Sequence, residues 1–286
     1  MTPQDIYSWI VEENETRLSK LWAEADNIRE KHVGNAVHLR GLIEISNHCE
    51  RRCSYCGINA ENTGLRRYRM SETEIFECVD LAVRYNYGTV VLQAGEDYGI
   101  STESLVNLIR KIKEKTLLAV TLSLGERPLE ELKVWRGVGA DRYLLRFETS
   151  DQELYNRIHP SAGKADCHRL EQLAAIQELG YEIGSGIMVG IPGQSFASII
   201  QDLILFREMD LDMIGVGPWL PHPSTVLGSE TEPVSRSCFA LVPNTDLMTS
   251  KVLALARILC PEANIPATTA LAIATRCCCP PESCCG

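Results

Sequence analysis

The sequence feature that most constrains the fold is a repeat of short apolar runs, one about every thirty residues, separated by amphipathic stretches. The apolar runs are predicted to be strands, at Leu42–Ser46, Thr89–Gln93, Ala119–Leu124, Arg142–Phe147, Gly184–Val189 and Met213–Val216. The stretches between them carry apolar residues at helical spacing, at Glu72–Tyr85, Ser104–Lys115, Arg169–Leu179 and Ser198–Met209. Strands that alternate with helices form parallel sheets, so we predict an α/β fold.

Helix boundaries support this assignment. Ser71 followed by Glu74 is a capping-box pattern at the start of a helix. Gly88, Gly139 and Gly180 each stand where a helix should end before the next strand.

Length and composition favour one large catalytic domain. The chain has 286 residues, 45% of them hydrophobic, and α/β barrels of about 250 residues are common. We predict a TIM-like (β/α) barrel with seven of its eight strands readable, the seventh at Ile265–Leu271 after a helix at Met248–Leu259. The predicted divisions are an N-terminal helical extension (1–38), the barrel (39–271) and an atypical Cys-rich tail (272–286).

The net charge of −10 argues against a nucleic-acid or anionic membrane surface, because both partners require clustered Lys and Arg. The segment Met1–Val33 has apolar residues at helical spacing and lacks the features of a signal or transit peptide. No stretch approaches the roughly 20 apolar residues of a membrane span. We therefore expect a cytoplasmic protein with a small-molecule or protein partner.

Three of the twelve cysteines form a CxxxCxxC motif, Cys49, Cys53 and Cys56, just after the first predicted strand. Thiols at this spacing can bind three irons of a [4Fe–4S] cluster and leave the fourth iron open. The alternative is a structural zinc site, which normally takes four protein ligands, and only His48 lies nearby. The cluster is therefore favoured.

Five segments resemble the HydE family of radical S-adenosylmethionine (SAM) maturases of [FeFe]-hydrogenase, itself similar to biotin synthase. They are Arg66–Met70, Val91–Asp97, Thr121–Glu126, Ala140–Arg146 and Asn264–Ala270. The resemblance runs from about Val33 to Leu271. It implies reductive cleavage of SAM at the cluster, giving a 5′-deoxyadenosyl radical, in maturation of the hydrogenase H-cluster.

The resemblance also implies roles for individual residues. Gly95 and Glu96 would hold the SAM amino group, Glu148 its methionyl or ribose portion, and Arg169 its carboxylate. The full set of implied SAM-binding residues is Tyr55, Gly95, Glu96, Arg146, Glu148, Arg169, Met188 and Gly190. For Arg146 and Glu148, an ordinary ion pair at the barrel rim remains the alternative.

Substrate contacts are predicted at Gln93, Thr121, Ser123, Thr268 and Thr269. Short hydroxyl side chains at predicted strand ends suit a carboxylate or cyanide group, although strand threonines are also common for packing reasons. His222 lies among prolines after the sixth strand, where it could line the mouth of the barrel or bind substrate, but a lone histidine among prolines is more often structural. The family implies an iron-complex or small-molecule substrate, a ferredoxin or flavodoxin as electron donor, and other hydrogenase maturases as partners.

Two related families provide contrasts. Biotin synthase needs cysteines at interior strand ends, where this chain has Gln93, Ser123 and Arg146. A methylornithine synthase-like mutase shares the Arg-Tyr-Arg and Gly-Glu-Asp segments and is the alternative enzyme.

The C-terminal segment departs from the family, because Cys277–Gly286 cannot supply an eighth strand and helix. We expect an altered end in preference to a metal-binding tail, and with it an open barrel of impaired activity. A truncated, inactive cluster-binding scaffold is the non-enzymatic alternative.

Overall fold

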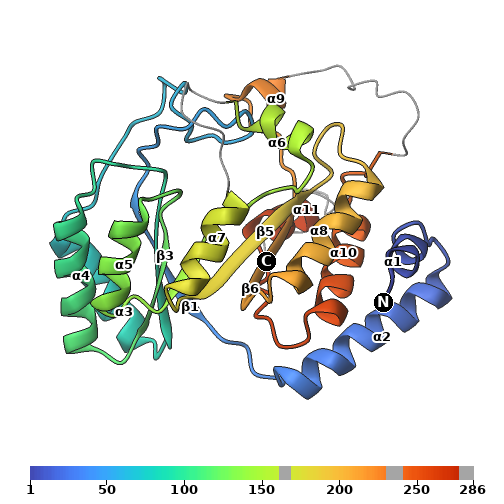
Figure 1. The fold of residues 1–286 in the computed structure, drawn as a ribbon, viewed down its shortest axis with the longest axis horizontal. Helices are drawn as coiled ribbons and strands as arrows, with labels where there is room; N and C mark the ends of the chain where they lie inside the picture. The colour runs from blue at the N-terminus through green and yellow to red at the C-terminus, as the bar shows by residue number, and fades with distance from the viewer. Residues whose placement is uncertain (161–168, 230–240, 277–286) are drawn as a thin grey trace, which may run out of the picture. The chain divides into compact units, whose positions relative to one another are not determined.

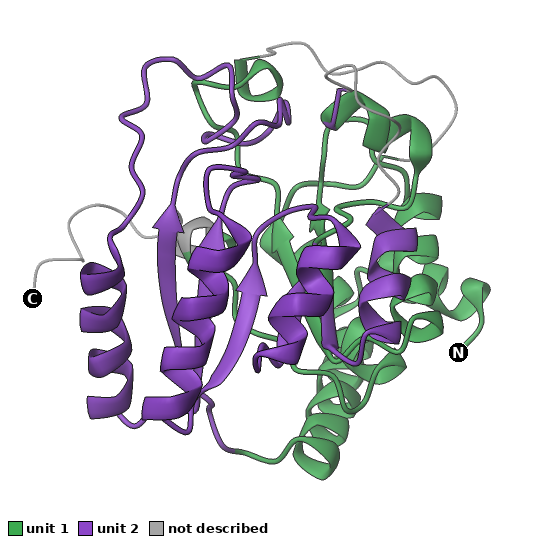
Figure 2. Ribbon diagram, turned by 60° about the vertical axis from the view of Figure 1, so that its left-hand side comes forward, with its two compact units in different colours: residues 1–35, 146–158, 185–286 green, residues 36–145, 159–184 purple. Residues whose placement is uncertain are grey.

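The computed structural model describes residues 1–160, 169–229 and 241–276 (Figure 1). The chain divides into two compact units (Figure 2). Unit 1 comprises residues 1–35, 146–158 and 185–286, and unit 2 comprises residues 36–145 and 159–184.

Unit 2 is a parallel sheet whose neighbouring strands follow chain order. Its strands are β1 (Arg40–Ser46), β2 (Thr89–Ala94), β3 (Ala119–Ser123), β4 (Arg142–Leu144) and the first residues of β5 (Glu182–Val189). Its helices are α3 (Glu72–Arg84), α4 (Thr102–Lys115), α5 (Leu129–Gly137) and α7 (Arg169–Glu178). The four successive repeats of strand and helix agree with the apolar periodicity of the sequence.

The two faces of this sheet differ in chemistry because side chains alternate along a strand. Val90, Leu92, Val120 and Leu122 are completely buried on the face covered by the helices, which Figure 2 shows in purple in front of the strands. On the opposite face, Val91 pairs with Thr121 and Gln93 pairs with Ser123. The polar residues of β2 and β3 therefore share one face.

Unit 1 contains the rest of β5, its neighbour β6 (Met213–Pro218), and a set of helices. The helices are α1 (Pro3–Ile10), α2 (Glu15–His32), α6 (Gln152–Ile158), α8 (Phe196–Glu208), α9 (Val226–Ser229), α10 (Asp246–Leu259) and α11 (Thr269–Arg276). Helix α10 packs against α2, α8 and β6. The buried ammonium group of Lys251 donates to the carbonyl of Ile10 at 3.0 Å, which fixes the end of α1 on α10.

The six predicted strands from Leu42 to Val216 are confirmed, with β4 ending at Leu144 instead of Phe147. The capping box of Ser71 and Glu74 is present at the start of α3. Gly139 and Gly180 adopt the positive φ angles, +110° and +85°, that end a helix. After α3, Asn86 takes this conformation with φ +55° in place of Gly88.

The predicted seventh strand at Ile265–Leu271 is wrong. Asn264 makes a single parallel bridge with Met213, and α11 then begins at Thr269. Pro266 has no backbone N–H and cannot donate to a strand ladder, so pairing ends after one bridge. Thr268 and Thr269 consequently stand at a helix start, not at a strand end, and residues 272–276 are helical.

No helix within the described ranges combines the length and apolar character needed to span a membrane. The predicted tail beyond residue 276 lies outside the described residues.

Candidate functional site

The three motif cysteines lie in the segment after β1, within a stretch that we call the cysteine loop (residues 47–62). One guanidinium fixes the shape of this loop. Arg67 donates to the carbonyls of Asn47 at 2.5 Å, Ile58 at 2.7 Å and Asn59 at 2.6 Å. Because these carbonyls come from both ends of the loop, Arg67 connects the two ends.

The thiols have the chemistry of cluster ligands. Cys49 and Cys56 are half-buried and Cys53 is 7% exposed. The pKa of Cys53 is raised to about 12, mainly by burial and to a smaller extent by Cys56 and Cys49, whereas Arg169 opposes the shift. Three thiols of one loop at the CxxxCxxC spacing can each bind a different iron of one cluster. The residues therefore fit a [4Fe–4S] cluster.

The described side chains do not form a site for a single metal ion. In the described part of the chain, no three His, Cys, Asp or Glu side chains gather closely enough to hold a single metal ion. A four-iron cluster has no such requirement, since each thiolate binds a different iron.

The end of β2 lies directly against the cysteine loop. A Cβ atom at Gly95 would stand 2.3 Å from the carbonyl oxygen of His48 and 2.7 Å from the Cβ of Cys49, so only glycine fits. The next backbone N–H, that of Glu96, donates to the Sγ of Cys49 at 3.4 Å. Gly95 and Glu96, both predicted from the sequence, thus adjoin the first cysteine.

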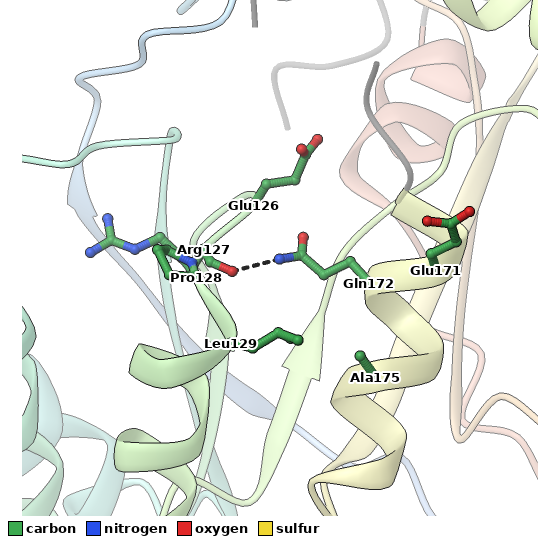
Figure 3. Close-up of a pocket in the computed structure, with 7 residues that line it drawn as sticks. All are labelled: Glu126, Arg127, Pro128, Leu129, Glu171, Gln172 and Ala175. Atoms are coloured by element: carbon green, nitrogen blue, oxygen red, sulfur yellow. Dashed lines mark hydrogen bonds between the residues drawn. The ribbon is translucent and has the colours of Figure 1, made fainter. Parts of the chain in front are cut away.

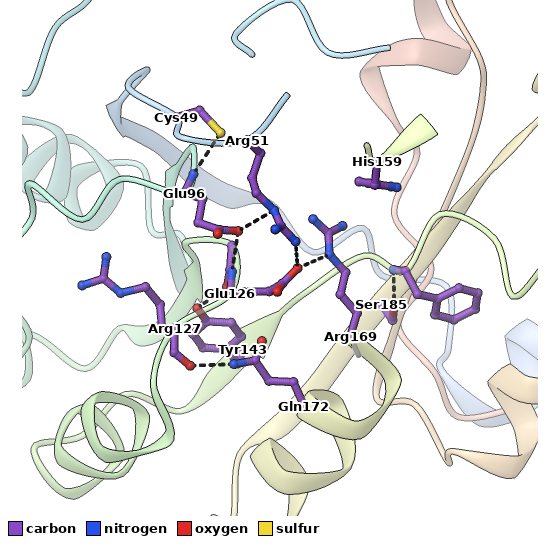
Figure 4. A network of polar contacts seen from close by, with 12 residues as sticks. Cys49, Arg51, Glu96, Glu126, Arg127, Tyr143, His159, Arg169, Gln172 and Ser185 are labelled. Carbon is purple, nitrogen blue, oxygen red and sulfur yellow. Dashed lines mark hydrogen bonds and ion pairs between the residues drawn. The ribbon is translucent and has the colours of Figure 1, made fainter. Parts of the chain in front are cut away.

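Beside Cys49 lies an ion-pair network of four residues, Arg51, Glu96, Glu126 and Arg169 (Figure 4). The Nε of Arg51 lies 3.4 Å from a Glu96 carboxylate oxygen, and its Nη2 donates to Glu126. The Nε of Arg169 donates to the same Glu126 oxygen at 2.9 Å. Burial raises the pKa of Glu96, and the neighbouring charge of Arg51 partly offsets this effect.

Asp97 has a different role from Glu96. Arg69 donates to both of its oxygens, at 2.7 and 2.8 Å, and the Ser46 hydroxyl donates at 2.6 Å. Burial alone would raise the pKa of Asp97, but these hydrogen bonds hold it at about 2. Asp97 therefore ties the Arg-Tyr-Arg segment to the end of β1.

Tyr55, the aromatic residue before Cys56, contacts a histidine that the sequence did not single out. Its hydroxyl lies 3.0 Å from the Nε2 of His159, and the two rings meet edge to face. His159 is 8% exposed. No local pattern links positions 55 and 159, so only the fold identifies this pair.

Of the predicted substrate residues, Gln93, Thr121 and Ser123 lie together on the polar face of β2 and β3. Thr121 is 1% exposed, and its hydroxyl oxygen has no hydrogen-bond partner among the described residues. A buried hydroxyl without a partner costs free energy and is a candidate contact for a ligand.

The remaining SAM-binding predictions fall in unit 1. Arg146 pairs with Glu148 at 2.9 Å and donates to the carbonyl of Ile187 at 2.7 Å. Glu148 has a φ of +63°, a conformation rare outside glycine that concentrates at functional sites. The backbone N–H of Met188 donates to the Glu148 carbonyl at 3.2 Å, so these two predicted residues adjoin.

Gly190 ends this segment in a tight turn with φ +80°, and a Cβ there would lie 2.4 Å from the Cα of Asn244. The buried side chain of Gln194 fixes the turn from inside. Its oxygen accepts from the N–H of Gly190 at 2.7 Å, and its nitrogen donates to the carbonyl of Met188 at 2.9 Å. The backbone is therefore held in one shape from residue 188 to residue 194.

The surroundings of Thr268, Thr269 and His222 differ from those of the other predicted contacts. Thr268 donates to the carbonyl of Val216 at 3.2 Å, and Thr269 is exposed in the first turn of α11. His222 is exposed and accepts from the N–H of Ser224 at 3.2 Å.

A cavity of about 500 Å³ lies in unit 2 between the segment after β3 and helix α7 (Figure 3). Its lining residues are Glu126, Arg127, Pro128, Leu129, Glu171, Gln172 and Ala175. None of the residues predicted from the sequence lines it, but Glu126 belongs to both the cavity and the ion-pair network.

The chain is similar in sequence to known radical SAM proteins. The profile of the radical SAM superfamily matches residues 43–205. The [FeFe] hydrogenase maturase subunit HydE of Thermotoga maritima is 45% identical over 247 residues, which cover 86% of this chain and 67% of that protein. The 3-methylornithine synthase of Methanosarcina acetivorans is 30% identical over 270 residues, which cover 94% of this chain and 73% of that protein.

Among solved structures, the crystal structure of methylornithine synthase (PylB) superposes with a TM-score of 0.81 at 28% identity. The similarity covers 93% of this chain and 75% of that chain.

Proposed function

Because the chain belongs to the radical SAM superfamily and, within it, to the HydE family, we propose specific tasks for its residues in hydrogenase maturation. The chain is an enzyme that uses a [4Fe–4S] cluster and SAM, and its family matures [FeFe]-hydrogenase. When bound, the cluster and SAM supply one-electron chemistry that yields a 5′-deoxyadenosyl radical.

In unit 2, Cys49, Cys53 and Cys56 would hold three irons of the cluster. Glu96 would accept hydrogen bonds from the ammonium group of SAM, and Arg169 would bind its carboxylate. The observation that carries this assignment is the ion-pair network beside Cys49, where two carboxylates and two guanidiniums adjoin a cluster thiol. An amino acid offers the complementary pair of charges, and charge-assisted hydrogen bonds are the strong ones.

In unit 1, the proposed contacts are one ion pair and one fixed turn of the backbone. Glu148 and Arg146 would contact the ribose or methionyl portion of SAM, and Met188 and Gly190 would pack against its adenine. The fixed turn at Gly190 supports this assignment, since a backbone without a side chain lets a flat ring approach closely.

The substrate would be an iron complex or a small molecule. Gln93, Thr121 and Ser123 would bind it on the polar face of β2 and β3, and the buried hydroxyl of Thr121 supports this placement. Thr268 and Thr269 would be further contacts of the substrate. A ferredoxin or flavodoxin would donate electrons, other maturases would be partners, and the location would be cytoplasmic.

The test is anaerobic reconstitution of the 286-residue chain with iron and sulfide. A [4Fe–4S] spectrum that changes when SAM is added, followed by 5′-deoxyadenosine after reduction, is the expected result. Maturation of apo-hydrogenase in an extract lacking HydE then tests the pathway role. Conversion of lysine to methylornithine would support the alternative enzyme, and a cluster without SAM cleavage would support the inactive scaffold.

A further inference from the structure

In unit 2, two arginine side chains donate hydrogen bonds to the same carboxylate oxygen. Glu126 accepts from Arg51, which lies between the cluster cysteines, and from Arg169, the first residue of α7. Their side chains are 21%, 14% and 10% exposed, so the contacts are largely shielded from water. Glu126 therefore links the cysteine loop to helix α7 by charge-assisted hydrogen bonds.

Glu126 is itself held by its surroundings. Its backbone N–H donates to the carboxylate of Glu96 at 3.1 Å, and its carbonyl accepts from the hydroxyl of Tyr98 at 3.1 Å. The preceding Gly125 has φ +73°, and its carbonyl accepts from the buried Tyr143 hydroxyl at 2.8 Å. A carboxylate on such a segment has few positions available, so it can fix the groups bound to it.

The charges alternate along the network in the order Glu96, Arg51, Glu126, Arg169 (Figure 4). Without Glu126, both guanidiniums would lose the anion that they share, and the repulsion between them would be less compensated in a site of reduced dielectric constant. Arg169 would lose the hydrogen bond that its Nε donates to Glu126.

We propose that Glu126 is a positioning residue for SAM binding. It holds Arg169 through Nε and so orients the guanidinium that would bind the SAM carboxylate, and through Arg51 it connects this arginine to the cysteine loop. This inference rests on the proposed function, in particular on the assignment of the SAM carboxylate to Arg169. Glu126 touches neither the cluster nor SAM in this role.

The central variant is Glu126→Gln, which keeps the shape of the side chain and removes its charge. The matched control is Glu130→Gln, four residues along in an exposed position of α5. Both chains are reconstituted anaerobically, and iron content, thermal stability and the SAM dissociation constant are measured. SAM binding is followed through the change in the electron paramagnetic resonance spectrum of the reduced cluster.

We expect Glu126→Gln to weaken SAM binding by about tenfold to a hundredfold while iron content stays that of the parent chain. Glu130→Gln should leave SAM binding unchanged. Glu126→Asp, which restores the charge on a shorter side chain, should recover part of the loss. In an Arg169→Met background, Glu126→Gln should add less than about a twofold effect, because the two residues act as one unit.

Equal or tighter SAM binding by Glu126→Gln would overturn the proposal and indicate that Glu126 competes with SAM for Arg169. Parallel loss of iron and SAM binding, with full additivity in the Arg169→Met background, would also overturn it and leave Glu126 as part of the folded frame. Failure of the parent chain to bind SAM would instead contradict the proposed function. The two ideas therefore fail in distinguishable ways.

Discussion

The predicted SAM-binding residues of the two units differ in how they are held. In unit 2, Glu96 and Arg169 belong to a network of alternating charges whose members are fixed by one another. In unit 1, Gly190 and Met188 belong to a segment fixed by backbone hydrogen bonds to the side chain of Gln194. Ion pairs therefore hold Glu96 and Arg169, whereas a buried amide side chain holds the backbone at Met188 and Gly190.

SAM has a charged amino-acid end and a flat adenine end, and the proposed contacts in the two units differ in a corresponding way. A charged amino-acid end is best recognised by forked, charge-assisted hydrogen bonds. A flat adenine offers mainly surface, which a glycine-containing turn can approach closely. Substitutions in unit 2 should therefore mainly affect cluster and ligand binding, whereas substitutions in unit 1 should mainly affect the stability of the fold.

The largest effect is expected in unit 2 from Cys53→Ala. Two remaining thiols cannot hold a four-iron cluster with one open iron, so cluster absorbance and 5′-deoxyadenosine should fall below detection. Cys78→Ser, in helix α3 outside the motif, is the control and should retain both signals. A Cys53→Ala chain that cleaves SAM like its parent would remove the cysteine loop from the mechanism.

In unit 1, the buried carboxyl of Asp202 should make stability depend on pH. Burial raises the pKa of Asp202 to about 7, although the Ser150 N–H and hydroxyl both donate to it. The folded chain keeps this proton up to about pH 7, whereas the unfolded chain releases it near pH 4. Stability should therefore fall by roughly 4 kcal/mol between pH 4 and pH 7 and level off above that.

Thermal unfolding of the full chain across this pH range measures the effect. Asp202→Asn should flatten the pH dependence, and Asp80→Asn, at an exposed site on α3, should not. Identical curves for Asp202→Asn and its parent would mean that this carboxyl is ionised in the folded chain.

Gly190→Ala tests whether backbone shape matters in unit 1. The new Cβ would meet the Cα of Asn244 at 2.4 Å, where neither backbone can easily move. The expected loss of stability is at least about 2 kcal/mol, or several degrees in melting temperature. Gly34→Ala is the matched control, because Gly34 has the same φ of +80° with nothing within 4 Å.

The control should lose only about 1 kcal/mol, the cost of the left-handed conformation alone. If both alanine variants lose the same amount, close approach at Gly190 contributes nothing and the contrast between the units weakens.

The smallest effect is expected from Thr121→Val in unit 2, which removes a buried hydroxyl that has no hydrogen-bond partner among the described residues. Stability should stay the same or rise by about 1 kcal/mol, while hydrogenase maturation falls and SAM cleavage persists. Thr89→Val, on the same face of the sheet, removes an acceptor used by Arg142 and should lower stability. Unchanged maturation by Thr121→Val would make Thr121 an ordinary strand residue.

The parallel strands and the cysteine motif could be predicted from the sequence, because both depend on local spacing. Apolar periodicity located all six strands from β1 to β6. It failed at Ile265–Leu271, where an apolar run contains Pro266 and a helix start follows. An apolar run alone does not reveal whether its backbone can join a ladder.

The pairings of the site could not be predicted in the same way. Glu126 lies 75 positions from Arg51 and 43 from Arg169, and nothing in the local sequence connects them. His159 is likewise 104 positions from Tyr55. A signal for Glu126 did exist, since it ends the Thr121–Glu126 segment that resembles the HydE family, but its partners emerge only from the fold.

The hydrogen bonds of Arg67 have a consequence for how the enzyme acquires its iron. Because this side chain joins Asn47 to Ile58 and Asn59, the protein's own hydrogen bonds meet part of the entropy cost of ordering the cysteine loop. A cluster that binds there would have less chain to order, so more of its binding free energy would go into holding the iron.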